Sequence, residues 1–339
     1  MDLNTIWFVL IGVLIAGYAV LDGFDLGVGA LSLFARSPEE RDLHVAAVAP
    51  VWDGNEVWLL TGGGALFAAF PAVYATVFSG FYLALMLLLV ALIARAVALE
   101  FRGQVAAPGW KGFWGAAFGV GSLLPAILFG VAVGNVLRGV PIAEGFAWQG
   151  SFLGLLNPYA ILVGLVTGAL FVMHGALYLR TKSEGALEER MRGVALRTFV
   201  AFVVLYALGT VATGFVSPFL FARVTEPLGL LLTLLLLASA VGVPVFTRAG
   251  KARLAFTASS VLIVAMILVV AVNAYPVLVV SSLGPDKSLT IYNAASSPRT
   301  LLTMLVIALV GMPIVLVYTV LGYRVFRGKT RAGQGYQAV

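Results

Sequence analysis

Nine stretches of roughly twenty mainly apolar residues follow one another along this chain. A helix rises about 1.5 Å per residue, so about twenty apolar residues are needed to cross the hydrocarbon core of a bilayer. The composition agrees, because 61% of the residues are hydrophobic and 11% are charged, against about 25% charged residues in soluble domains. The sequence therefore predicts an all-α integral membrane protein with nine transmembrane helices, near residues 6–34, 52–70, 77–101, 113–138, 157–180, 198–221, 227–247, 255–276 and 300–325.

Positive charges are distributed unevenly between the two sets of predicted loops. Of the 21 lysines and arginines, 16 fall on the side that holds the C-terminus and 4 on the other side, while Arg95 lies inside the third stretch. Cytoplasmic loops carry the excess of such residues, so we expect the C-terminus in the cytoplasm and the N-terminus outside. These loops explain the net charge of +6 without a nucleic-acid partner. The chain has no cysteine, which excludes disulfides, iron–sulfur clusters and covalently attached haem.

The loops suggest two units and an addition. Residues 1–140 are expected to form a first four-helix membrane bundle and residues 141–280 a second one, while residues 281–339 supply a peripheral ninth helix and a basic cytoplasmic tail. In a weak internal repeat, residues 20–23 resemble residues 172–175. Two units of the same orientation would explain this repeat, although gapped matches of this length also arise by chance.

A short helix is predicted between the first two spans. Ser37 supplies an N-cap, Pro38 suits the first helical position, and Pro50 ends the segment. The helix, near residues 38–49, is expected to lie along the cytoplasmic interface. Its His44 is expected to be exposed there.

Two carboxylates lie within the first apolar stretch. Asp22 and Asp25 are spaced i, i+3 and share one face of a helix, and Gly23 and Gly27 on the same helix allow another helix to come close. Because an ionisable residue within a bilayer costs several kcal/mol unless it is paired, neutral or hydrated, this face must point toward protein or water. Either the acids form a charge pair with Arg95, or they serve a proton or ion path.

A second polar cluster opens the second span. Asp53 and Glu56 are again spaced i, i+3, with Asn55 between them. Acids in a first helical turn can simply complement the helix dipole. Alternatively, Asp53 with Asp22 and Asp25 would form a chain of carboxylates leading inward from the cytoplasm, and such chains mark proton relays or ion paths.

The chain offers no convincing redox centre of its own. Its two histidines fall in unlike settings, and His174, within an apolar span, is expected to be a hydrogen-bonded structural residue and not a ligand. We therefore predict no catalytic residue, no cofactor-binding residue and no metal ligand in this chain.

Several motifs together resemble subunit II of cytochrome bd-type quinol oxidases. The two principal segments are Gly-Phe-Asp-Leu-Gly-Val-Gly at 23–29 and Pro-Val-Trp-Asp-Gly-Asn-Glu-Val-Trp-Leu at 50–59. Further matches lie at residues 63–71, 78–82, 134–141 and 288–297, so the resemblance covers nearly the whole chain. It is dense before residue 141 and sparser after it.

The resemblance implies a respiratory membrane heterodimer that oxidises quinol and reduces dioxygen to water. In that family, haems b558, b595 and d are bound by subunit I, and subunit II carries none. The expected location is the bacterial plasma membrane, with subunit I as the partner. A small single-span accessory subunit and a structural quinone or lipid are left open. The fold implied is two four-helix bundles with a peripheral ninth helix.

The family is thought to take up protons from the cytoplasm through subunit II. The matching positions here are Asp25 and Asp53. Residue type varies in the family at Asp22, and part of the family has glutamine at the position of Glu56. The residues expected to support the path are Arg95, Glu56 and Asn55.

Two other functions compete with this interpretation. A proton-coupled secondary transporter also uses intramembrane carboxylates, but usually with inverted repeats and acids near the middle of the membrane. A purely structural scaffold for a haem-bearing partner would give Asp25 and Asp53 no proton role.

Overall fold

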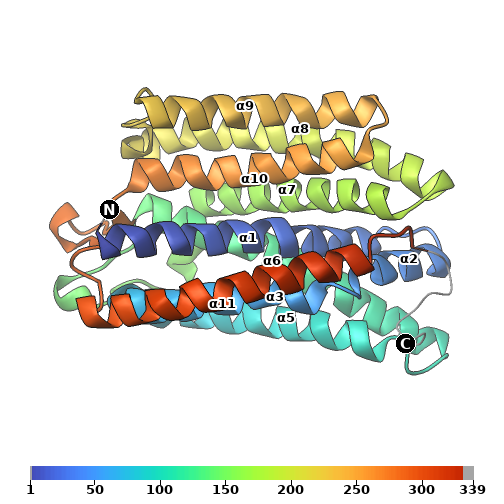
Figure 1. The fold of residues 1–339 in the computed structure, drawn as a ribbon, viewed down its shortest axis with the longest axis horizontal. Helices are drawn as coiled ribbons and strands as arrows, with labels where there is room; N and C mark the ends of the chain where they lie inside the picture. Colours follow the sequence, from blue (N-terminus) through green and yellow to red (C-terminus); the bar gives the residue numbers. More distant parts are fainter. Residues whose placement is uncertain (1, 331–339) are drawn as a thin grey trace.

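A computed structural model describes residues 2–330, which form long helices running along one common axis (Figure 1). Within this range eight helices are long and apolar enough to cross a membrane, and nine spans result if the bent pair α3–α4 is taken as one. The fold is thus an all-α membrane fold. The helices are α1 (Leu3–Ser32), α2 (Pro38–Val48), α3 (Trp52–Ala69), α4 (Pro71–Gly80), α5 (Tyr82–Phe101), α6 (Pro108–Arg138), α7 (Pro158–Lys182), α8 (Gly185–Val216), α9 (Pro227–Arg248), α10 (Ala252–Ala274) and α11 (Pro298–Val325).

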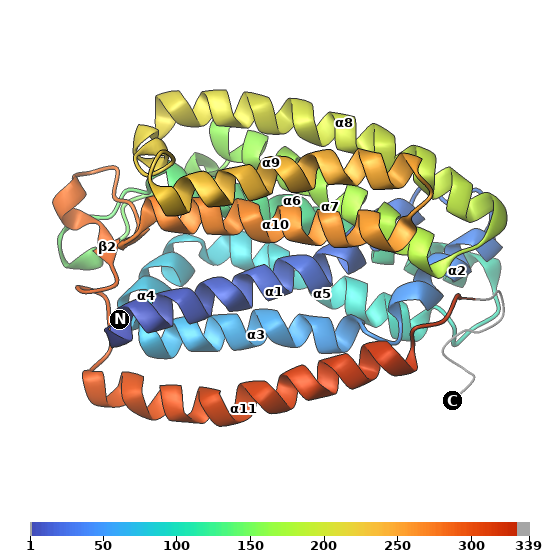
Figure 2. The same cartoon turned by 45° about the horizontal axis from the view of Figure 1, so that its top comes forward.

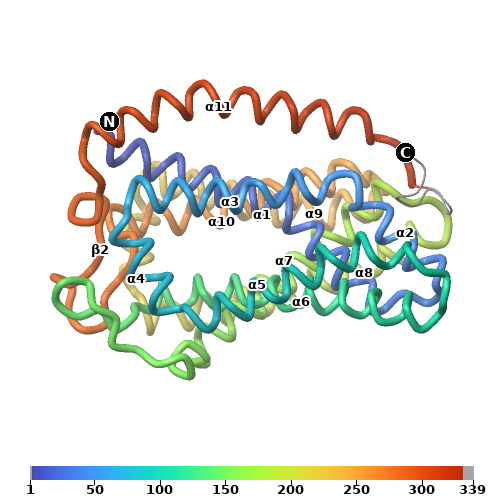
Figure 3. Tube along the Cα trace, turned by 90° about the horizontal axis from the view of Figure 1, so that it is seen from below, coloured from blue at the N-terminus to red at the C-terminus, as the bar shows by residue number. Residues whose placement is uncertain are grey.

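The two halves of the chain lie on opposite sides of the molecule. In Figure 1, α7 to α10 occupy one side and α1, α3, α5 and α6 the other, with α1 packed against both α6 and α7 where the halves meet. The substantial contacts of helix α11 with other helices are those with α1 and α3. Figures 2 and 3 show α11 along the outside of the molecule. The ninth helix is therefore peripheral, as the sequence predicts.

The two ends of the molecule differ in charge. One end carries α2, the connections α5–α6, α7–α8 and α9–α10, and the end of α11, and it holds most of the lysines and arginines. We call it the basic end. The opposite end carries the start of α1 and of α11 together with a small antiparallel pair of strands, β1 (Val277–Val279) and β2 (Leu289–Thr290). The all-helical prediction did not include this strand pair.

The helix between the first two spans forms as predicted. The hydroxyl of Ser37 accepts a hydrogen bond from the backbone N–H of Glu40, and Pro38 occupies the first position of α2. A side-chain N-cap of this kind satisfies one of the backbone donors that a helix start leaves free. At its other end, helix α2 stops at Val48, within one residue of the predicted boundary.

The predicted second and third spans need a correction between residues 71 and 80. That segment forms a separate helix, α4, which is bent by 119° from α3. Phe70 adopts a non-helical backbone (φ −131°, ψ 66°) immediately before Pro71. Proline disfavours a helical conformation in the preceding residue and donates no hydrogen bond, so the chain turns here although the segment is apolar.

The sixth span also begins earlier than predicted. Helix α8 starts at Gly185, whereas hydropathy placed the span at 198–221, and it ends at Val216 before Pro218. Its 32 residues extend about 48 Å, which exceeds the roughly 30 Å of a bilayer core. The polar first turns, which contain Glu188 and Arg192, therefore project beyond the bilayer at the basic end.

Candidate functional site

Two fully buried charged side chains pair between α1 and α5. Nη2 of Arg95 lies 2.5 Å from Oδ1 of Asp22, and Nη1 lies 3.0 Å from Oδ2. Two parallel charge-assisted hydrogen bonds of this kind fix the orientation of both groups. The charge pair between Asp22 and Arg95, one of the alternatives raised by the sequence, is present.

Two more carboxylates reach the same guanidinium. Oε1 of Glu56 lies 3.1 Å from Nη1 of Arg95, and Oδ2 of Asp25 lies 3.9 Å from Nη2. The Glu56 side chain is 23% exposed, whereas the other three side chains are fully buried. We call Asp22, Asp25, Glu56 and Arg95 the Arg95 cluster. Its three carboxylates share one guanidinium, so Arg95 can stay paired when any one of them changes its state.

Asp25 is held by a second set of contacts. Nδ2 of Asn55 donates a hydrogen bond of 2.7 Å to Oδ2 of Asp25, and the hydroxyl of Tyr323 donates one of 2.9 Å to Oδ1 of Asn55. The side-chain amide of Asn55 therefore links α11 to the acid on α1. Oδ1 of Asp25 is buried and has no hydrogen-bond partner within residues 2–330.

Two glycines on another side of α1 allow α7 to approach this helix closely. A Cβ atom on Gly27 would lie 1.9 Å from the carbonyl oxygen of Phe171 and 3.0 Å from the Cα of Gly175. On Gly23 it would lie 2.8 Å from the Phe171 ring. Small residues allow such close contact between membrane helices. The predicted role of Gly23 and Gly27 is confirmed, because their side of α1 packs against α7. The acids lie on another side of the helix, where they contact α5 and α3 and are fully buried.

Asp53 lies outside the Arg95 cluster. It is in the first turn of α3, is exposed, and makes no hydrogen bond or ion pair in the described part of the chain. The predicted chain of carboxylates is therefore interrupted, because Asp53 and Asp25 do not touch. Asn55, two residues beyond Asp53, is the polar side chain that contacts Asp25.

Comparison with known proteins identifies the family. The sequence profile of the family described as cytochrome bd terminal oxidase subunit II matches residues 3–326. The chain belongs to this family. It is therefore a subunit of a terminal oxidase, an enzyme complex of the respiratory chain and an integral membrane protein.

Curated relatives agree with the assignment to subunit II. The chain is 37% identical to the probable cytochrome oxidase subunit 2 of Haemophilus influenzae, over 97% of this chain and 96% of the relative. It is 38% identical to the cytochrome bd-I ubiquinol oxidase subunit 2 of Escherichia coli, over 94% of this chain and 92% of the relative. The transporter alternative finds no support in these relatives.

The fold has a counterpart among solved structures. A chain from the structure of bd oxidase from Geobacillus thermodenitrificans superposes with a TM-score of 0.80, covering 96% of this chain and 99% of the other. The sequence identity is 16%, so this likeness concerns the fold alone.

The histidine of α7 in this subunit II chain does not suit a haem. Nδ1 of His174 lies 2.7 Å from the hydroxyl of Ser259, and Nε2 lies 3.0 Å from the carbonyl oxygen of Val20. The ring stacks on Phe256 with their centroids 4.7 Å apart. Both nitrogens are thus engaged, and a haem ligand would have to break one of these contacts. The side chain fits the predicted structural role.

The second histidine contradicts its prediction. His44 is fully buried and not exposed, because the face of α2 that also carries Ala47 and Val48 packs inward. Burial, together with the positive charges of Arg190 and Arg41, lowers the pKa of His44 to about 4. No group of three or more acidic, histidine or cysteine side chains within residues 2–330 is arranged to hold a metal ion.

Tyr323 was not predicted from the sequence. This residue lies near the end of α11, the helix predicted to be peripheral to the two four-helix bundles. Tyrosines are common at the ends of membrane helices, where they anchor to the interface, so its position carried no specific signal. Only the arrangement of α11 against α3 brings its hydroxyl to Asn55.

Proposed function

We propose that this chain is the haem-free subunit of a quinol:dioxygen oxidoreductase and conducts protons toward the haem site of subunit I. The relatives named ubiquinol oxidase subunit 2 support quinol as the reductant. Family membership implies subunit I as partner. Haems b558, b595 and d are proposed to lie in that partner, and the engagement of both ring nitrogens of His174 supports this placement. A structural quinone or lipid and a small third subunit are further candidates for the apolar outer helix faces.

The orientation of the chain follows from its charge. The basic end is proposed to face the cytoplasm, because lysine and arginine are enriched in cytoplasmic loops. Protons would then enter at the end where Asp53 lies exposed at the start of α3. Quinol releases protons when it is oxidised, and dioxygen consumes them when it is reduced to water. Release outside and uptake inside would build a transmembrane gradient without a pump.

The observation that carries the proposal is the free oxygen of Asp25. Buried polar atoms almost always have a hydrogen-bond partner in protein or water. Oδ1 of Asp25 has none within the described chain, while Oδ2 is held by Asn55. An ordered water or a donor from subunit I would satisfy it, and either one would give a proton a route to or from this carboxyl group.

The other members of the Arg95 cluster would keep that carboxyl group in place. Asp22 holds Arg95 by two hydrogen bonds, so Arg95 stays in position whether Asp25 carries a proton or not. Asn55 donates to Oδ2 and thereby orients the second oxygen away from itself. In this arrangement Asp25 is the proton carrier, while Asp22, Arg95, Glu56 and Asn55 position it. Asp53 would collect protons at the surface, with water joining it to Asp25.

The test is oxygen consumption by the purified complex. Asp25→Asn keeps the shape and the contact with Asn55 but cannot ionise, so turnover is expected to fall by roughly tenfold or more if general acid–base transfer at this group limits the rate. Haem content, read from the reduced-minus-oxidised spectrum, should not change. The matched control is Asp286→Asn, because Asp286 is an exposed acid at the opposite end of the molecule. Normal turnover in the Asp25→Asn complex would leave only the scaffold role.

A further inference from the structure

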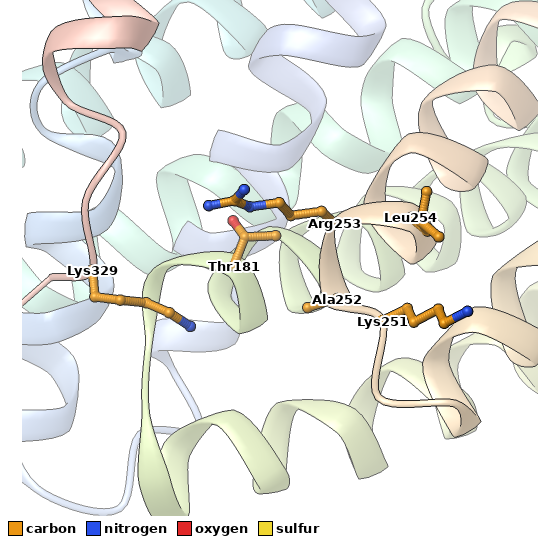
Figure 4. Close-up of a pocket in the computed structure, with 6 residues that line it drawn as sticks. All are labelled: Thr181, Lys251, Ala252, Arg253, Leu254 and Lys329. Atoms are coloured by element: carbon orange, nitrogen blue, oxygen red, sulfur yellow. The ribbon is translucent and has the colours of Figure 1, made fainter.

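A pocket of about 330 Å³ opens at the basic end, between three segments that are far apart in the sequence (Figure 4). It lies between the end of α7, the start of α10 and the segment that follows α11. For comparison, a cavity of about 150 Å³ is large enough to hold benzene. The residues that line the pocket are Thr181, Lys251, Ala252, Arg253, Leu254 and Lys329.

Two of the lining cations have no partner in the described part of the chain. The side chains of Lys251 and Arg253 are exposed and make no hydrogen bond or ion pair within residues 2–330. Lys251 is also the N-cap residue of α10, and it provides no side-chain cap. The backbone donors of that first turn therefore add to the positive potential of the two side chains.

The third cation is fixed in place. Nζ of Lys329 lies 2.6 Å from the carbonyl oxygen of Ser183 and 3.3 Å from that of Arg180, at the C-terminal end of α7. Among residues 2–330, the acidic side chain that forms an ion pair with it is Glu188, at 3.9 Å. The lining thus holds three cations and one carboxylate lies beside it, so the pocket has an excess of positive charge.

Two of the three cations lie on the Thr181 side of the pocket. In Figure 4 the guanidinium of Arg253 lies beside Thr181, the amino group of Lys329 extends into the space below Thr181, and the amino group of Lys251 points away. The Thr181 hydroxyl donates its proton to the carbonyl of Tyr178, so it offers no donor here and the cations supply the positive charge. A group with several acceptor oxygens, such as a phosphate, would meet two cations and a helix N-terminus here.

The position of the pocket selects a lipid as the source of that phosphate. Its walls are the end of α7, the start of α10 and the chain just beyond α11, and these three helices all qualify as membrane spans. The pocket therefore lies at the depth of the lipid headgroups. Leu254, 46% exposed, gives the pocket an apolar rim on the membrane helix itself. Basic pockets between the ends of membrane helices are known to bind anionic headgroups.

We propose that this pocket binds the headgroup of an anionic phospholipid, with the phosphate held by Arg253 and Lys329. Such a lipid would join α7 and α10 to the segment that follows α11. Helix α11 otherwise has very little buried surface. The bound lipid would thus help to fasten the peripheral helix at its basic end.

The experiment is native mass spectrometry of the intact complex, purified in detergent through a tag on this chain, stripped of lipid and titrated with phosphatidylglycerol. The double variant Arg253→Gln/Lys329→Gln is expected to weaken binding roughly tenfold or more, since each cation near an anionic lipid adds to the attraction. The control is Arg36→Gln/Lys111→Gln, which removes the same charge from the same end of the molecule. Neither side chain of the control pair has a partner within residues 2–330.

Further arms separate the outcomes. Arg253→Gln alone leaves the tether of Lys329 to α7 intact, so it should also weaken phosphatidylglycerol binding even if the double variant proves unstable. Phosphatidylcholine should bind no better to the unmodified complex than to the variant. Equal losses in the test and control pairs, or unchanged binding in both variants, would overturn the proposal. Displacement of the lipid by millimolar inorganic phosphate would assign the pocket to a soluble anion instead.

Discussion

The contact between α1 and α7 at Gly27 is the tightest helix contact next to the Arg95 cluster, and it predicts a large effect from a single methyl group. In Gly27→Ala the added Cβ would lie 1.9 Å from the carbonyl oxygen of Phe171, about 1.5 Å short of the 3.4 Å at which ordinary contact begins. That oxygen belongs to the backbone of α7, so no side-chain rotation can relieve the overlap. The two helices must separate or shift instead.

The cost of that shift can be estimated. Overpacking usually costs about 1–3 kcal/mol, and the upper end applies here because the obstacle is backbone on both sides. A gap of about 0.5–1 Å already removes a quarter to a half of each dispersion contact along the interface. We therefore expect a loss of about 3 kcal/mol, which corresponds to a fall in Tm of roughly 5–10 °C.

The assay is thermal unfolding of the purified complex in detergent, with Gly12→Ala as the control. Gly12 lies on the same helix, and a Cβ there would have no neighbour within 4 Å. Alanine is a better helix former than glycine by about 1 kcal/mol, so the control should match or exceed the unmodified protein. If both variants melted together, the close approach of α1 and α7 would not exist as described.

Three further perturbations test the site and its surroundings. Arg95→Gln should lower the free energy of unfolding by about 3–5 kcal/mol, because it leaves three carboxylates without their cation. The loss should exceed that of Asp22→Asn, after which Arg95 keeps two partners. Equal losses of the two variants in chemical denaturation would contradict this. Tyr323→Phe removes one donor to Asn55, so it should lower the free energy of unfolding by about 1 kcal/mol. It should also slow oxygen consumption while the haem content stays unchanged. Full activity would exclude a positioning role for Tyr323. Because the folded-state pKa of His44 is lowered to about 4 from 6.5, the folded chain binds fewer protons than the unfolded chain below pH 6.5, and its stability should fall by about 2 kcal/mol by about pH 5. His44→Gln should remove that part of the pH dependence of Tm, and an unchanged pH profile would show that His44 does not titrate as described.

Much of the fold was predictable because a bilayer imposes one length and one composition on every span. Apolar windows and loop charges were enough to place the long helices and their alternating directions. The exceptions have local causes. Residues 71–80 are as apolar as a span, so hydropathy could not reveal the bend that Pro71 introduces. The early start of α8 was hidden because its first turns are polar and lie outside the bilayer.

The candidate site was predictable in part. Charged residues in an apolar stretch need partners, and Arg95 was the one cation within a predicted span, so its pairing with Asp22 followed from energetics. The burial of His44 was not predictable in this way, because α2 has similar polarity whether it lies on the membrane surface or packs against α7. The division of the chain at residues 140 and 280, and the repeat that suggested it, stay predictions.

Helix α11 has a stronger connection to the site than its peripheral position suggests. Most of its side chains face outward, and apolar contact gives little net attraction between helices in lipid, since acyl chains are equally apolar. Its attachments are polar and lie at its two ends: the indole of Trp7 donates to the carbonyl of Leu301 at 3.0 Å, and Tyr323 donates to Asn55 at 2.9 Å. The second attachment acts on the amide that orients Asp25, so any movement of the basic end of α11 alters the carboxyl group proposed to carry protons. A helix held in this way can be displaced by a partner or loosened by loss of its lipid without unfolding the bundle, and the proton path would respond before the fold does.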